Sequence, residues 1–103
     1  FSQTLVVKKV PDCVSTEEVV RFVRQATPNF ADHCLMPDKY AARTRFAFIN
    51  YESGEEGEAG LRKLRAAIEM AKAIGDPAWA SRILVFHRSQ GPNTIFDPTF
   101  PLR

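Results

Sequence analysis

The segment that most constrains the fold is residues 44–51, which read Thr-Arg-Phe-Ala-Phe-Ile-Asn-Tyr. Aromatic and β-branched residues at this density are typical of a β-strand. Successive side chains of a strand point to opposite faces, so Phe46 and Phe48 share one face. Ala47 and Ile49 share the other. The segment therefore predicts a strand with one core face and a second face that carries two aromatic rings.

Three other segments have strand character. Residues 4–10 are rich in β-branched residues, residues 30–36 form a weaker apolar stretch, and residues 82–87 contain a continuous apolar run at 83–86. Turn-forming residues bound these segments, as expected for short strands. We therefore expect four strands in all.

Two segments begin with a capping box, in which a serine is followed three residues later by a glutamate. The boxes open at Ser15 and Ser53. Apolar residues then recur at helical spacing until Pro28 in the first segment and Gly75 in the second. Each segment is therefore predicted to be an amphipathic helix.

The predicted order is β-α-β-β-α-β, which indicates an α+β fold of the ferredoxin-like type. In this sandwich a four-stranded antiparallel sheet packs on two helices, and the other sheet face stays open. The residues expected in the core between the sheet and the helices are Leu5, Val7, Val19, Phe22, Val23, Ala47, Ile49, Leu61, Leu64 and Ile68.

Residues 44–51 resemble the longer ribonucleoprotein motif of the RNA-recognition motif (RRM) family, K/R-G-F/Y-G/A-F-V-x-F/Y, at six of its eight positions. Residues 5–10 fall where the family has its shorter motif. The resemblance covers residues 4–87 and implies an RRM-like domain over residues 1–90, with a C-terminal tail at 91–103. It also implies that the open sheet face binds single-stranded RNA.

In this family, aromatic rings stack on bases while neighbouring basic and polar groups meet phosphates and base edges. The resemblance therefore implies an RNA-binding set on the open face and beside it. Its members are Phe46, Phe48, Lys8, Val6, Arg43, Arg45 and Asn50.

The sequence departs from the family pattern at three positions. Val6 stands where the shorter motif has an aromatic residue, and Thr44 and Arg45 replace the basic residue and the glycine that open the longer one. One stacking ring is thus missing, which costs about 1–3 kcal/mol of binding energy. An RRM-like module that binds a partner protein through its sheet face or its helices is the alternative.

Related folds include acylphosphatases and copper chaperones, but their motifs are missing. Residues 7–15 contain no glycine that could let backbone amides close on an anion, and Cys13 has no C-x-x-C partner. His33 adjoins Cys34, and adjacent strand residues point to opposite faces, so this pair is a poor chelate. We expect neither an enzyme nor a cofactor or metal site.

The composition is that of an ordinary folded domain, with 45% hydrophobic and 25% charged residues and a net charge of +2. The sequence has no apolar run of membrane-spanning length, and we expect its first residues not to be a signal peptide. We expect a nuclear or cytoplasmic protein that does not enter a membrane. Because the chain begins with Phe1, we also expect it to be part of a larger protein.

The last strand and the tail after it are both unusually apolar. Residues 83–86 are apolar without alternation, which predicts a strand buried on both faces. The tail is apolar but interrupted by prolines, so we expect residues 93–102 to fold back along the sheet near this strand. The alternative is that the tail is a mobile linker and that the strand contacts a partner. The apolar residues of the tail are Ile95, Phe96, Phe100 and Leu102.

Overall fold

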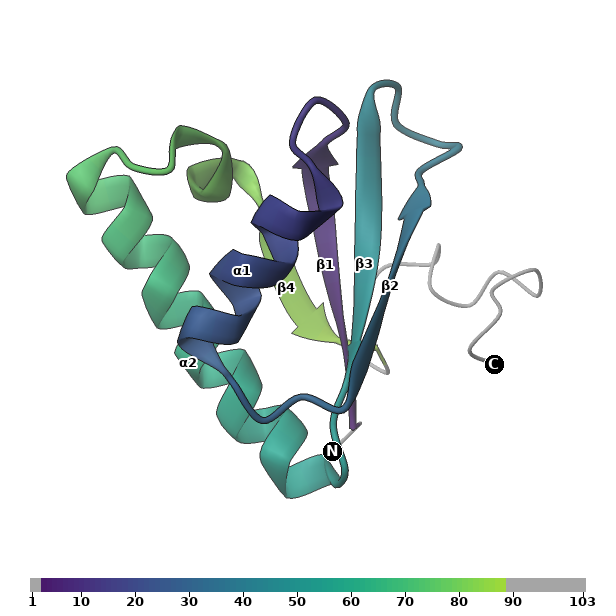
Figure 1. The fold of residues 1–103 in the computed structure, drawn as a ribbon, viewed down its shortest axis with the longest axis vertical. Helices are drawn as coiled ribbons and strands as arrows, with labels where there is room; N and C mark the ends of the chain where they lie inside the picture. Colours follow the sequence, from purple (N-terminus) through teal and green to yellow (C-terminus); the bar gives the residue numbers. More distant parts are fainter. Residues whose placement is uncertain (1–2, 89–103) are drawn as a thin grey trace.

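The computed structural model describes residues 3–88, and the predicted packing of the tail lies outside this range. Within this range two α-helices, one 3-10 helix and four strands follow one another along the chain (Figure 1). No helix in residues 3–88 has the length and apolar character needed to cross a bilayer. The elements are β1 (Thr4–Pro11), α1 (Thr16–Ala26), β2 (Asp32–Pro37), β3 (Thr44–Asn50), α2 (Gly54–Ile74), the 3-10 helix η1 (Ala78–Arg82) and β4 (Leu84–His87).

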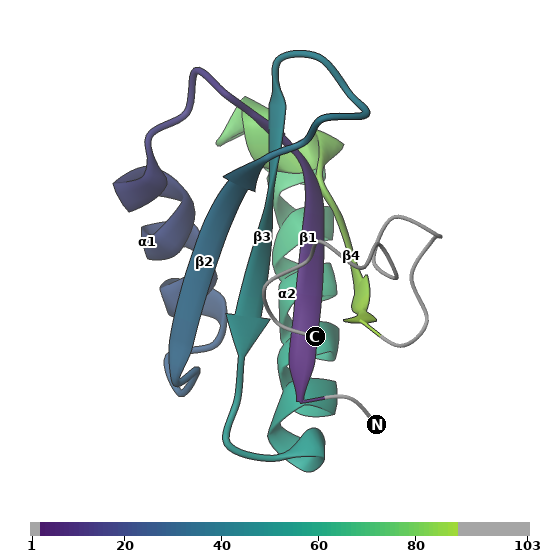
Figure 2. The same ribbon diagram turned by 90° about the vertical axis from the view of Figure 1, so that its right-hand side faces the viewer.

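The four strands form one antiparallel sheet in the order β2-β3-β1-β4. Both helices cover the same face of this sheet, and within residues 3–88 the opposite face carries no helix (Figures 1 and 2). The predicted α+β class, with a four-stranded antiparallel sheet packed on two helices, is therefore confirmed. The strand order places β2 and β4 at the two edges.

Both predicted helix starts are confirmed by capping hydrogen bonds. Ser15 Oγ accepts from the backbone N–H of Glu18 at 3.1 Å, and Ser53 Oγ accepts from that of Glu56 at 3.2 Å. These bonds satisfy amides that the first helical turn leaves without partners. Gly75 ends α2 with a φ of 82°, a conformation that glycine adopts without strain.

The main core lies between the helices and the helix-covered face of the sheet. Nine of the ten residues expected there are buried in it, and the tenth, Phe22, is half-buried and packs against it. Tyr51, which follows β3, is also buried in this core. The assignment of the two faces of β3 is therefore confirmed.

Strand β1 contains a bulge at Lys8 and Lys9, which gives these two lysines different environments. The pairing register with β3 shifts between Val7 and Val10, and Lys9 adopts a φ of 65°. The extra residue allows both valines to enter the main core. Lys8 is left on the helix-free face, whereas Lys9 is exposed.

The prediction that the last strand is buried on both faces is wrong. Leu84 is 50% exposed and Phe86 is half-buried, whereas Val85 and His87 are buried. Residues 78–82 form η1 instead of extending the strand, so β4 begins only at Leu84. Its burial therefore alternates, because only one of its faces packs on the helices.

Candidate nucleic-acid interface

The helix-free face carries a row of side chains that crosses all four strands. The pairing registers place Cys34 of β2 beside Phe48 of β3, Phe48 beside Val6 of β1, and Val6 beside Phe86 of β4. This face is turned toward the viewer in Figure 2. We call the apolar group centred on this row the sheet-face cluster, which consists of Val6, Phe46 and Phe48 with Met36 and Phe86 packed against them.

The two phenylalanine rings of the sheet-face cluster touch edge to face. Their centroids lie 5.4 Å apart and their planes are inclined by 88°. Phe46 is 6% exposed and Phe48 is fully buried, so the expectation that both rings face solvent is wrong. The pattern of a strand gives the face to which a ring points, whereas its burial depends on everything that packs around that face. A base can stack on these rings only after their surroundings rearrange.

Two cations lie near the rings. Lys8 Nζ is 5.8 Å from the Phe46 centroid, and Arg88 Cζ is 5.8 Å from the Phe48 centroid. Both distances are within the range of a cation–π interaction. Sequence reasoning selected Lys8 but missed Arg88, which directly follows β4 and stands two positions after Phe86, where alternation would place a side chain on the same face.

Lys8 also forms an ion pair inside this face. Its Nζ is 3.2 Å from Asp38 Oδ2, and the Asp38 side chain is only 3% exposed. The second carboxylate oxygen of Asp38 accepts from the backbone N–H of Tyr40 at 2.9 Å. The positive charge of Lys8 is therefore partly neutralised within the protein.

Asn50 lies on the helix-free face but its amide is engaged. Thr4 Oγ1 donates to Asn50 Oδ1 at 2.7 Å, and Asn50 Nδ2 donates to Asp32 Oδ1 at 2.6 Å. These bonds join β1, β3 and β2 at one end of the sheet. These two bonds use one N–H and one lone pair of the Asn50 amide, which has two of each.

The two arginines do not join the sheet-face cluster. Arg45 is an odd-numbered residue of β3, so its side chain lies on the helix-covered side, where it donates to Thr16 Oγ1 at 3.0 Å and to the carbonyl of Val14. Arg43 is exposed in the loop before β3, and its carbonyl accepts from the N–H of Asp12 at 3.0 Å. Of the seven expected residues, the structure thus brings together Val6, Lys8, Phe46 and Phe48, with Asn50 at the end of the same face.

No model of a known protein family matches this chain, and no curated protein resembles it significantly. The evidence for a function is therefore the geometry of the molecule itself. Within residues 3–88, no three His, Cys, Asp or Glu side chains are grouped so that they could hold a metal ion.

Proposed function

We propose that this chain is an RRM-type domain, with a ferredoxin-like βαββαβ arrangement, that binds single-stranded RNA through its helix-free sheet face. The observation that carries the proposal is the placement of a cation beside each ring of the sheet-face cluster, on a face without a helix. Lys8 accompanies Phe46 and Arg88 accompanies Phe48. Such a domain acts as a binding module rather than an enzyme, in the nucleus or the cytoplasm.

The chemistry of this face matches an unpaired nucleotide. Aromatic rings stack on bases of any identity, because every base has a π-face, and cations beside them attract the phosphates. Each stacked base contributes about 1–3 kcal/mol. Phe46 and Phe48 lie on one strand with centroids 5.4 Å apart, so two successive bases could engage them.

Two features reduce the expected affinity. Val6 supplies no ring on β1, and the burial of Phe46 and Phe48 means that part of the binding energy is used to uncover them. The Lys8–Asp38 ion pair also competes with phosphate for the lysine. We therefore expect RNA binding to be weak and to decrease with salt.

The test compares two phenylalanine-to-leucine variants by fluorescence anisotropy with a pool of short unstructured RNAs. Leucine preserves most of the apolar volume, whereas Phe48→Ala would leave a cavity that costs about 3–5 kcal/mol of stability. Phe48→Leu should lower RNA affinity by about 1–3 kcal/mol, because leucine cannot stack. The matched control, Phe22→Leu on the helix side, should leave the affinity unchanged. Equal affinities for the two variants would contradict the proposal.

A second candidate function is binding of a partner protein, and the burial of the rings favours it. Because Phe48 is fully buried, the aromatic surface is closed in this structure, as it would be in a domain that uses another surface. If RNA binds neither the unmodified chain nor its variants, this second function becomes the preferred one.

A further inference from the structure

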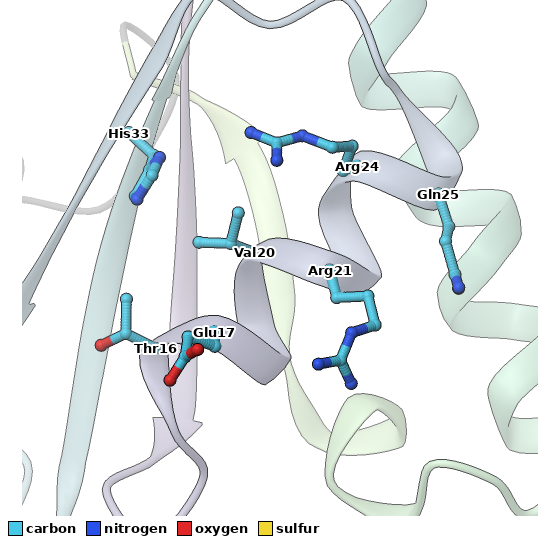
Figure 3. A pocket seen from close by; sticks show the side chains of 7 residues that line it. All are labelled: Thr16, Glu17, Val20, Arg21, Arg24, Gln25 and His33. Atoms are coloured by element: carbon cyan, nitrogen blue, oxygen red, sulfur yellow. The ribbon is translucent and has the colours of Figure 1, made fainter.

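A groove runs between α1 and the edge strand β2, on the side of the sheet opposite the sheet-face cluster. Its volume is about 520 Å³. Figure 3 shows that Thr16, Val20 and Arg24 point from α1 toward β2, with His33 on the strand side. These three residues are spaced by four, so they form one stripe along the helix. Glu17 and Arg21 line the groove beside the stripe.

The charge of the groove is predominantly positive. Arg21 and Arg24 are exposed and form no ion pair with a carboxylate of residues 3–88; Glu17 is the opposing charge in the lining. Arg24 lies over the ring of Phe30, with Cζ 4.9 Å from its centroid, which holds one guanidinium at the edge of the groove. Val20, half-buried, supplies an apolar floor between the charged ends.

The strand that borders the groove has a free edge. Within the described sheet β2 pairs with β3 alone, and the backbone N–H of Asp38 donates to Thr44 at 3.0 Å. Hydrogen-bonded pairs alternate in an antiparallel ladder, so the even-numbered residues of β2 bond to β3. The N–H and C=O groups of His33 and Leu35 therefore point outward. An exposed edge of this kind is a template for an added strand.

An added strand on the edge of β2 would also place side chains in the groove. Residues directly opposite one another in a sheet place their side chains on the same face. A peptide residue that bonded to His33 or Leu35 would therefore direct its side chain to the helix side, toward the Thr16–Val20–Arg24 stripe. Alternate side chains of the peptide would therefore contact the Arg24 guanidinium at one end of the groove, Val20 in the middle and Thr16 at the other end.

We propose that this groove and the outer edge of β2 bind an extended acidic segment of a partner protein, with an apolar side chain over Val20 and carboxylates at Arg21 and Arg24. The peptide adds to the sheet as a fifth strand. This site lies on the other side of the sheet from the proposed RNA surface, so the two proposals can fail independently. Backbone bonding supplies affinity, and the two arginines select acidic sequences.

The test measures the fluorescence anisotropy of a short labelled peptide as the whole chain is added to it. In this peptide threonine alternates with glutamate, leucine and glutamate, in that order. Binding should be saturable, and the same peptide with lysine in place of glutamate should not bind. Arg24→Glu should weaken binding roughly fivefold or more, because it replaces an attraction with a repulsion. The matched control is Lys63→Glu, an equal charge change at an exposed position of α2, which should leave binding unchanged.

Two further measurements separate strand addition from simple charge attraction. Methylation of the peptide amides that would bond to β2 should abolish binding, because it removes the backbone donors. Amide NMR shifts should appear at His33, Leu35 and α1 and leave Val6, Phe46 and Phe48 unaffected. Absence of binding, equal effects of Arg24→Glu and Lys63→Glu, or tolerance of methylation would each overturn the proposal.

Discussion

The phenolic oxygen of Tyr51 lies 2.7 Å from the hydroxyl oxygen of Thr27 in the interior of the protein. Thr27 is fully buried and Tyr51 is 1% exposed. Thr27 caps the C-terminus of α1 and Tyr51 follows β3, so this hydrogen bond fixes the helix to the end of the central strand. Its loss would leave a buried hydroxyl group without a partner.

The first prediction is that Tyr51→Phe destabilises the protein by about 1–3 kcal/mol, because the Thr27 hydroxyl then has no partner. Urea unfolding gives this free energy. Adding Thr27→Val to Tyr51→Phe removes both polar groups and should restore part of the loss. If the double variant loses the full sum of the two single effects, the two hydroxyl groups are not coupled.

The second prediction concerns alkaline pH. Burial raises the pKa of the Tyr51 phenol above its usual value, and the hydrogen bond with Thr27 opposes part of this increase. A group whose pKa is higher in the folded state contributes stability that is complete below its unfolded pKa, near 10, and is lost as pH rises through its folded pKa. The free energy of unfolding should therefore decrease above about pH 10 by more in the unmodified chain than in Tyr51→Phe. Parallel pH profiles of the two proteins would contradict this.

The third prediction concerns Gly60, where α2 crosses the ring of Tyr51. A Cβ at this position would overlap the phenolic oxygen and lie 2.5 Å from Cζ. Gly60→Ala gains about 0.5–1 kcal/mol in helix propensity, but overpacking costs about 1–3 kcal/mol, so thermal unfolding should show a net loss. In a Tyr51→Leu background, which removes the ring, the same substitution should be tolerated. A Gly60→Ala protein as stable as the unmodified chain would show that the ring can move aside.

The fourth prediction is that Lys8→Met lowers stability by up to about 3 kcal/mol, since it leaves the buried Asp38 carboxylate without its counter-charge. Lys9→Met is the matched control, because Lys9 is exposed and forms no ion pair within residues 3–88. Its effect should be within about 0.5 kcal/mol. Similar unfolding midpoints for the two variants would mean that the ion pair contributes little.

Much of the fold follows from local signals in the sequence. Strand alternation assigned Ala47 and Ile49 to the core and Phe46 and Phe48 to the opposite face. The serines at positions 15 and 53 located both helix starts. These signals predict local structure because the spacing of apolar residues and the capping of a helix each depend on a few consecutive residues.

The parts that could not be predicted depend on contacts between distant residues. Alternation places Arg45 on the helix-covered side, but the groups that accept from its guanidinium, the Val14 carbonyl and Thr16 Oγ1, come from a distant part of the sequence. The bulge at Lys9 has no glycine to signal it. The burial of Phe48 and the pairing of Lys8 with Asp38 likewise depend on segments far apart in the chain. The RNA-binding proposal depends on Phe48 and Lys8, and their roles stay predictions.

The most direct test of RNA binding is an amide NMR titration of the whole chain with a pool of short single-stranded RNAs at low salt. If the helix-free face binds RNA, the amides of Val6, Phe46, Phe48 and Arg88 should shift progressively and to saturation. Higher salt should reverse the shifts, because phosphate contacts carry much of the affinity. No shift on β1 or β3 at the highest RNA concentration, or shifts confined to α1 and β2, would contradict the proposal.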